Sequence, residues 1–405
     1  MTEQAKVPAI RFAGFTDPWE QRKASEVFQI VDDRGHPTLP VLSATQNQGM
    51  IYRDDSGRYI GHDESNEIGY KRVLPGDFVV HLRSFQGGFA HSQYEGITSP
   101  AYTVFRAKEP TSHSDRFWKH WFMSEHFIAG LSTVTYGIRD GRSISVDEFM
   151  NTFLAFPAVE EQAAISRLFD YLDDLITLHQ RKYDKLVIFK KSMLEKMFPK
   201  DGESVPEIRF AGFTDPWEQR KLENLASFGG GHTPSMADAS NYVDGKILWV
   251  TSQDVKQHYI ENTTTMISEK GAATLTLYPS DSIVIVARSG ILRHTIPVAK
   301  LRKPATVNQD IKVIQTVDSC DSSWLLQYFI ASNKTLLREY GKTGTTVESI
   351  DFAKMKSTAL MVPYIEEQQA IGSFFSRLDN LITLHQRKLE LLQNIKKSLL
   401  DKMFA

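Results

Sequence analysis

The chain has 405 residues, of which 41% are hydrophobic and 24% are charged, and its formal net charge is −2. This composition excludes a disordered chain and allows two or more domains with cores of their own. The single cysteine, Cys320, excludes a disulfide framework and a cysteine-based metal site, which favours a cytoplasmic location. No apolar run approaches the roughly 20 residues of a membrane span, so no membrane association is expected.

The head of the chain occurs twice. Residues 7–23 read VPAIRFAGFTDPWEQRK, and residues 205–221 repeat them with a single change. The repeat divides the chain into two units, 7–198 and 205–404, joined by the polar segment PKDGES. Since the segments that follow the two heads, 24–156 and 222–362, share little sequence, the chain has two like frames that carry unlike inserts.

Each unit ends in a copy of one long amphipathic segment. Residues 157–198 and 363–404 align without a gap and are identical at 25 of 42 positions. Each copy begins at a proline, has Glu-Glu-Gln in its first turn, and repeats apolar residues at alternating steps of three and four. This pattern predicts two long helices with a heptad seam, which we expect to pack on each other.

One histidine of each predicted helix, His179 or His385, falls on the seam. We interpret them as a polar layer that fixes the register, because buried polar residues do this in coiled coils. A metal pair or a pH switch is the alternative. No cysteine or carboxylate lies nearby at ligand spacing, which favours the structural role.

Both inserts combine strand-like and helix-like segments. Strands are predicted in four runs separated by turn-forming residues: 77–85, 101–107, 246–252 and 281–289. Each insert ends with a predicted helix, at about 115–131 in the first and about 322–340 in the second. We therefore expect each insert to be a compact α+β domain.

Catalytic motifs fail on inspection. The GKT at 341–343 lacks the preceding glycine of a P-loop, because Leu336 stands in its place. The GGG at 229–231 is interpreted as a flexible loop, since no βαβ context surrounds it. There is no GxSxG, HExxH or DFG motif. We expect no catalytic residue, no metal site and no cofactor.

Polar and basic residues gather in two loop regions. The stretch between Asp281 and Asp310 contains no acid. Its candidate DNA contacts are Arg288, Arg293, His294, Lys300, Lys303, Asn308 and Gln309. The comparable run of the first insert offers Tyr70, Lys71, Arg72, His81, Arg83 and Gln86. Because arginine, asparagine and glutamine bond base edges while lysine and arginine hold phosphates, the two groups indicate nucleic-acid binding.

Several segments resemble the specificity subunits of Type I restriction-modification enzymes. The resemblance covers nearly the whole chain. It is carried by the repeated Pro-x-x-Glu-Glu-Gln-x-Ala-Ile helix start and by four insert segments: FGGGHTPSMADASNYVDGKILWVTSQDV (228–255), ATVNQDI (305–311), LPVLSATQNQGMI (39–51) and GITSPAYTVF (96–105).

The resemblance implies an α+β chain in which two α/β target-recognition domains stand in a pseudo-two-fold arrangement, separated by two long antiparallel coiled-coil helices. Its parts would be recognition domains with conserved heads at 1–156 and 205–362, a spacer helix and hinge at 157–204, and a second spacer helix at 363–405. The implied function is non-catalytic reading of a bipartite, asymmetric site in double-stranded DNA. The implied partners are two methyltransferase subunits and two restriction subunits. Further candidate DNA contacts are Arg139, Arg142, Ser252, Gln253 and Lys342.

One feature departs from this expectation. The first insert holds 12 lysines and arginines against 16 acids, so its DNA contacts must be concentrated in one patch. A bivalent protein-protein scaffold would also use two unlike heads on a helical spacer. Salt-sensitive DNA binding separates the two alternatives, since phosphate contacts give a steep salt dependence. A stand-alone nuclease or methyltransferase is disfavoured by the missing motifs.

Overall fold

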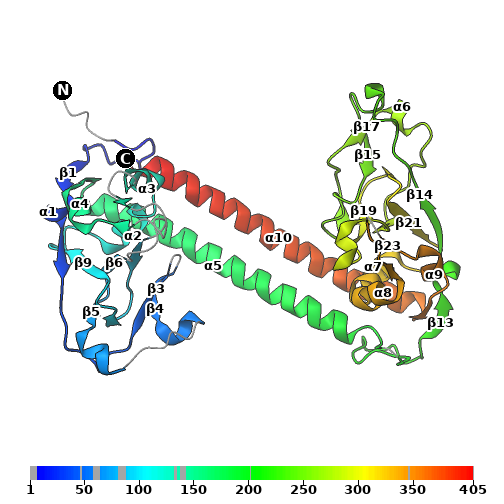
Figure 1. Cartoon of the computed structure of the whole chain (residues 1–405), viewed down its shortest axis with the longest axis horizontal. Coiled ribbons are helices and arrows are strands. Elements are labelled where there is room, and N and C mark those ends of the chain that lie inside the picture. Colours follow the sequence, from blue (N-terminus) through cyan, green and yellow to red (C-terminus); the bar gives the residue numbers. More distant parts are fainter. Residues whose placement is uncertain are drawn as a thin grey trace. The chain divides into compact units, whose positions relative to one another are not determined.

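The computed structural model describes residues 7–45, 48–57, 64–80, 88–131, 135–136, 143–200, 202–344 and 347–404. The chain divides into two compact units, labelled by element in Figure 1. Unit 1 combines residues 1–180 with 387–405, and unit 2 comprises residues 181–386. None of the described helices has both the length and the apolar character needed to cross a bilayer.

Unit 1 is built around a four-stranded antiparallel sheet in the order β2-β9-β6-β7. Its strands are β1 (Glu20–Lys23), β2 (Phe28–Val31), β3 (Leu42–Thr45), β4 (Gly49–Tyr52), β5 (Lys71–Val73), β6 (Phe78–Val80), β7 (Phe89–His91), β8 (Gly96–Thr98), β9 (Thr103–Ala107), β10 (Thr135–Tyr136), β11 (Ser143–Ile144) and β12 (Phe153–Phe156). Its helices are α1 (Ala24–Val27), α2 (Asp115–Trp121), α3 (Glu125–Leu131), α4 (Val146–Asn151) and the first part of α5 (Val159–Lys196). An aromatic core that includes Phe28, Phe105 and Trp118 joins the sheet to α2.

Unit 2 contains a five-stranded sheet, β14-β21-β18-β19-β16, and a three-stranded sheet, β17-β15-β20. Its strands are β13 (Glu218–Lys221), β14 (Ala226–Gly230), β15 (Ile247–Val250), β16 (Tyr259–Ile260), β17 (Met266–Ile267), β18 (Ile283–Val286), β19 (Val298–Leu301), β20 (Ala305–Val307), β21 (Ile311–Thr316), β22 (Gly341–Lys342), β23 (Ser349–Ile350) and β24 (Ala359–Val362). Its helices are α6 (Glu269–Ala272), α7 (Ser322–Ala331), α8 (Asn333–Tyr340), α9 (Phe352–Lys356) and the first part of α10 (Ile365–Met403).

The α+β class and the two long helices are confirmed. Two predicted helices are shorter than expected, because each is interrupted by a new helix start. Ser124 separates α2 from α3 and accepts a hydrogen bond from the Phe127 amide, while Ser332 separates α7 from α8. The predicted strands shorten to β6, β9, β15 and β18 within the described residues.

The same frame closes both units. In each, the end of the repeated head forms a strand that pairs antiparallel with the strand before the long helix: β1 with β12, and β13 with β24. The Arg11 guanidinium contacts the Glu161 carboxylate at 2.6 and 2.9 Å, and Arg209 contacts Glu367 at 2.7 and 2.8 Å. Both glutamates are buried, so these bidentate pairs hold each head against the first turn of its helix.

The glutamine of the Glu-Glu-Gln motif has an equally repeated role. The Gln162 amide donates to the Pro157 and Ser112 carbonyls at 2.8 and 3.2 Å, and its oxygen accepts from the Ser114 amide at 2.9 Å. Gln368 makes the corresponding bonds to Pro363, Ser319 and Asp321 at 2.9, 3.2 and 2.8 Å. A buried side chain of this kind ties the insert to the helix start in both units.

Each unit also contains the end of the other repeat's helix. In unit 1 the Lys396 ammonium of α10 lies 2.5 Å from the Asp173 carboxylate of α5. In unit 2 the Lys190 ammonium of α5 lies 2.6 Å from the Asp379 carboxylate of α10. The two pairs occupy matching positions of the repeat, so each half-helix meets its partner in the same register.

Breaking the less exposed of these two pairs should weaken unit 2. The side chains of Lys190 and Asp379 are only 9% and 12% exposed, so Lys190→Met leaves a carboxylate without its cation. We expect a loss of about 3 kcal/mol in the free energy of unfolding, measured by urea denaturation. The control is Lys196→Met, whose pair with Glu207 is 41% and 48% exposed and is therefore expected to contribute little to stability. Equal losses in the two variants would contradict this account of the seam.

Candidate nucleic-acid interface

Four loops of unit 2 meet at one edge, which we name the recognition edge: residues 231–233, 251–253, 287–289 and 308–310. Strands β15 and β20 are parallel, so the loops that follow them emerge side by side. The Asn308 amide donates to the Val250 carbonyl at 3.0 Å, and the Ala287 amide donates to the Asp310 carbonyl at 2.7 Å. These bonds join three of the four loops.

The glycine-rich segment leads into the fourth loop. The sequence predicted a flexible loop here, but the first two glycines belong to a strand. Gly229 and Gly230 belong to β14, and the Tyr278 hydroxyl bonds both the amide and the carbonyl of Gly230 at 2.8 Å. A Cβ atom on Gly231 would stand 1.8 Å from the Val307 carbonyl oxygen. Glycine is required here because the backbone of the loop passes directly against β20.

The loop after β15 is held by Asp254. Its carboxylate accepts hydrogen bonds from the amide and hydroxyl of Thr251 at 2.9 and 2.8 Å, and from those of Thr264 at 2.7 Å each. Burial raises the pKa of Asp254, but these hydrogen bonds outweigh it and lower the pKa below its ordinary value. The charged carboxylate therefore fixes the loop that carries Ser252 and Gln253.

The predicted contacts on the recognition edge differ in their exposure and in the hydrogen bonds that their side chains make. Arg288 and Gln253 are exposed, Ser252 is half-buried, and Gln309 is exposed but accepts a hydrogen bond from the Thr233 hydroxyl at 2.6 Å. Within the described part of the chain, no side-chain bond or ion pair engages the Arg288 guanidinium. Arg288 therefore offers an uncommitted set of donors.

Two predicted contacts of the second insert are buried in the domain. The Lys300 ammonium lies 2.8 Å from the Asp281 carboxylate and donates to the Ser323 hydroxyl at 2.8 Å. Asn308 uses its amide group within its own turn, where it contacts the backbone amide and the carboxylate of Asp310. We therefore revise the role of Lys300 to a structural one, and that of Asn308 to support of the loop that presents Gln309.

The other predicted cations of unit 2 are exposed, and two of them have acidic partners. Arg293 forms an ion pair with Glu348, and Lys342 lies 2.8 Å from Asp351. His294 is exposed, and the Lys303 ammonium has only a 3.5 Å contact with the Asn262 side chain among the described residues. Lys303 is thus the predicted phosphate contact that the domain leaves most available.

In unit 1 the described part of the predicted patch is engaged by the protein itself. The Arg72 guanidinium lies 2.5 Å from Glu95 and 3.6 Å from Asp33. The Lys71 ammonium donates to the Tyr102 carbonyl at 2.8 Å, and the Arg53 guanidinium lies 5.9 Å from the centre of the Tyr70 ring. The remaining predicted contacts of this insert lie outside the described residues: His81, Arg83, Gln86, Arg139 and Arg142.

Sequence reasoning missed Thr233 and the supporting residues Tyr278 and Asp254. Thr233 follows the triple glycine directly, so its position beside a backbone that permits close approach was the available signal. Tyr278 and Asp254 gave no signal, because the bonds they make join residues 48 and 10 positions apart along the chain.

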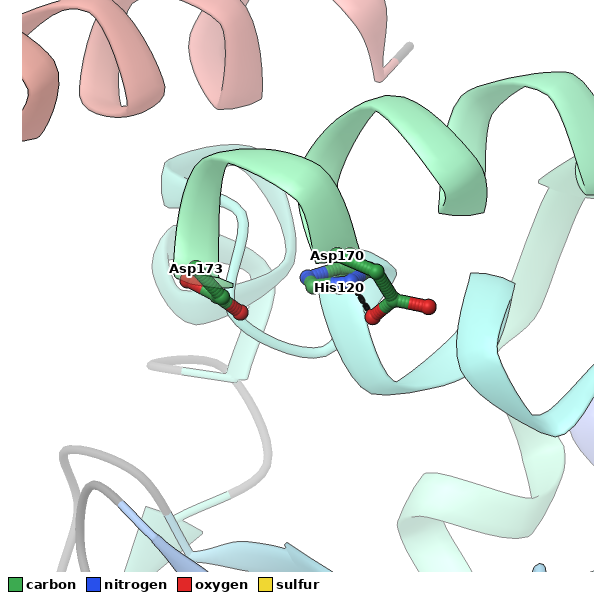
Figure 2. A group of neighbouring side chains, drawn as sticks. All are labelled: His120, Asp170 and Asp173. Carbon is green, nitrogen blue, oxygen red and sulfur yellow. Dashed lines mark hydrogen bonds and ion pairs between the residues drawn. The ribbon is translucent and has the colours of Figure 1, made fainter. Parts of the chain in front are cut away.

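One cluster in unit 1 has the composition of a metal site. Ligand-type atoms of His120, Asp170 and Asp173 lie within 4.8 Å of one another, and Figure 2 shows His120 bonded to Asp170. The Lys119 ammonium lies 3.5 Å from both carboxylates, and the Lys396 ammonium lies 2.5 Å from Asp173. Since two ammonium groups already balance the two carboxylates, we assign the cluster to an ion-pair network that joins α2, α5 and α10.

The protonation states in this cluster follow from burial and charge. Burial lowers the pKa of His120, so its neutral ring donates to Asp170 at 3.0 Å. Burial opposes ionisation of Asp170, but the His120 hydrogen bond and the charges of Lys119 and Arg116 bring its pKa down to about 2. Asp170 therefore stabilises the fold in its charged form.

We predict an acid-sensitive contribution from this network. Because the pKa of Asp170 is lowered from 3.8 in the unfolded chain to about 2 in the fold, its contribution is complete above about pH 4 and is lost as the pH falls toward 2. Asp170→Asn should remove this part of the pH dependence of thermal unfolding. Asp401→Asn is the control, since this carboxylate of the same unit is exposed to solvent. An unchanged acid limb in Asp170→Asn would refute the assignment.

The tight seat of Gly231 gives a second prediction. Gly231→Ala should displace the loop from β20 and reduce the affinity for DNA by about tenfold or more, measured by titration of the purified chain or its assembly. Gly230→Ala is the matched control, because its added Cβ would meet no atom closer than 3.4 Å, the Lys312 ammonium. Equal binding by both variants would show that this loop does not form part of the interface.

Parts of this chain are similar to known proteins. Residues 214–394 match the family model of the Type I restriction modification DNA specificity domain. The Type I restriction enzyme EcoR124I/EcoR124II specificity subunit of Escherichia coli is 31% identical over 166 residues, 40% of this chain and 41% of that protein. The MjaIX specificity subunit of Methanocaldococcus jannaschii is 29% identical over 196 residues, 46% of this chain and 44% of that protein. The matched parts thus span less than half the length of these two relatives.

Solved structures share the fold at low sequence identity. The Type I restriction-modification S subunit from M. genitalium has a TM-score of 0.66 at 12% identity and covers 99% of both chains. A chain from a study of complex assembly and conformational transition of the type I R-M system has a TM-score of 0.51 at 16% identity, covering 95% of this chain and 97% of that one. Residues 214–394 are thus similar to the DNA specificity domain of Type I restriction-modification systems, and the chain shares its fold with a solved S subunit of such a system.

Proposed function

We propose that this chain is the DNA-reading subunit of a Type I restriction-modification assembly and recognises a bipartite, asymmetric site in double-stranded DNA. Each insert reads one half of the site. The chain itself carries out no reaction. Methylation and cleavage belong to methyltransferase and restriction subunits, two of each, and the methyl donor S-adenosylmethionine binds to the methyltransferase.

The observation that carries this proposal is the contrast between the two frames and the two inserts. The frames make matching contacts, including the Arg11–Glu161 and Arg209–Glu367 pairs. The inserts differ in topology, with a four-stranded sheet in unit 1 and sheets of five and three strands in unit 2. A protein that presents two different readers on one repeated support suits a site whose halves differ in sequence.

The chemistry of the recognition edge supports base reading. Arg288 and Gln253 are exposed on loops whose backbones are fixed by hydrogen bonds, and arginine and glutamine are side chains that bond base edges. Rigid loops limit the entropy lost on binding. Lys303 follows β19 and is exposed. It is suited to a phosphate contact that does not depend on the DNA sequence.

The long helices supply the surface on which we place the methyltransferase subunits. Several large apolar side chains of these helices are exposed. In unit 2 they are Val187, Ile188, Phe189, Leu381 and Leu384, and in unit 1 they are Leu178, Leu391 and Ile395. Ile188 is 69% exposed and Leu391 58%. Exposed apolar side chains gathered along a helix are typical of a partner-binding surface.

Two exposed cations should separate base reading from phosphate binding. Arg288→Ala is expected to relax one position of the methylated motif, since a lost bidentate contact costs about 1 to 3 kcal/mol of discrimination. Lys303→Ala should weaken binding to all sequences alike and leave the motif unchanged. The motif is measured by methylation sequencing of cells that express each variant with its methyltransferase, and binding by titration at several salt concentrations.

The result that would refute the base-reading role is a uniform loss of affinity in Arg288→Ala with an unchanged motif. If the chain bound no DNA, and bound its protein partners with an affinity that salt does not change, the protein-protein scaffold would be favoured instead.

A further inference from the structure

The strongest feature of the recognition edge that the family resemblance does not explain is the fixed orientation of Gln309. A glutamine amide has one face that accepts, its oxygen, and one that donates, its nitrogen. The Thr233 hydroxyl donates to the Gln309 Oε1 atom at 2.6 Å, although both residues lie at the surface. One acceptor site of the oxygen is therefore engaged by the protein, and both donors of the nitrogen are left to meet a ligand.

The position of Thr233 is itself fixed from three sides. Tyr278 bonds the backbone of Gly230 through its hydroxyl, and Gly231 lies against the Val307 carbonyl with no room for a side chain. The Trp249 indole donates to the His232 carbonyl at 3.4 Å. The loop ends in Pro234, which is buried and has a restricted backbone. The hydroxyl of Thr233 is thus held at a set place beside Gln309.

The loop that carries Gln309 is equally restrained. The Asn308 amide donates to the Val250 carbonyl at 3.0 Å, and the Asn308 side-chain oxygen accepts from the Asp310 amide at 3.1 Å. Because both backbones are fixed, the contact between Thr233 and Gln309 orients the amide before any ligand arrives. Arg288, on the adjoining loop, presents only donors.

We propose that Thr233 is a positioning residue that presents the Gln309 amide nitrogen to DNA, so that unit 2 reads a G·C pair at this position rather than an A·T pair. This inference rests on the proposed function. In the major groove guanine offers the two acceptors N7 and O6, which suit an amide nitrogen. A freely turning glutamine would instead bond adenine through both its oxygen and its nitrogen.

The test compares variants at Thr233 in the full chain, expressed with its methyltransferase and read out by methylation sequencing. The base pair read by Gln309 is first identified as the one relaxed in Gln309→Ala. Thr233→Val removes only the hydroxyl, so the amide can turn and the position should admit A·T, with preference for G·C reduced by about tenfold. Thr233→Ser keeps the hydroxyl and should keep the wild-type motif.

A second variant keeps the inference testable if Thr233→Val unfolds. Gln309→Glu changes an exposed side chain, keeps an oxygen for Thr233 and removes both N–H donors. The carboxylate accepts from the cytosine amino group, so the preferred pair should invert from G·C to C·G. Thermal unfolding of every variant is measured beside the motif.

The outcomes separate the two levels of the argument. A wild-type motif with A·T at the Gln309 position, or an unchanged motif in Thr233→Val, would overturn the role of Thr233 and leave the DNA-reading function intact. A uniform loss at all positions in Thr233→Val would show that the residue supports the fold only, and would also overturn it. A wild-type chain that yields no two-part motif would overturn the proposed function, and the inference with it.

Discussion

The pairing of a lysine from the end of one long helix with an aspartate from the first half of the other is the constraint on which both units depend. Lys396 meets Asp173 in unit 1, and Lys190 meets Asp379 in unit 2. Each pair is accompanied by an aromatic contact. The ring centres lie 5.5 Å apart for Phe169 and Phe404, and 6.2 Å apart for Phe198 and Phe375. Each unit therefore completes its core with a segment of the other repeat.

This dependence explains why the two heads and much of the two helices are repeated while the inserts are not. A change in one head or helix must suit Glu161 or Glu367, the buried glutamines and the lysine-aspartate pairs at once. The loops of the recognition edge need to fit only the strands that carry them. The frame can stay constant while the loops of the recognition edge vary, which is the separation that the proposed sequence-reading role requires.

The sequence predicted the α+β class, the repeated heads and the long helices, because repeats and heptad spacing can be read directly from the order of the residues. It could not show that Arg11 binds Glu161 across 150 residues, or that Tyr278 holds Gly230. Such contacts arise only once the sheets are formed.

The candidate site was predicted in part for the same reason. Arg288 and Gln309 lie on adjoining loops, as their common basic stretch suggested, but Lys300 is buried within β19 and pairs with Asp281. A linear run of cations does not say which of them a strand turns inward. The first insert is rich in acids, and in unit 1 two of them, Glu95 and Asp33, form ion pairs with the predicted contact Arg72.

The central claim is that each insert reads its own half of a divided site while the frame is indifferent to sequence. The most direct measurement is the methylated motif of a chain in which residues 24–156 are replaced by the equivalent insert of another such subunit, expressed with its methyltransferase. The account predicts that one half of the motif changes and the other half, read by unit 2, is retained. A motif that changes in both halves, or in neither, would contradict it.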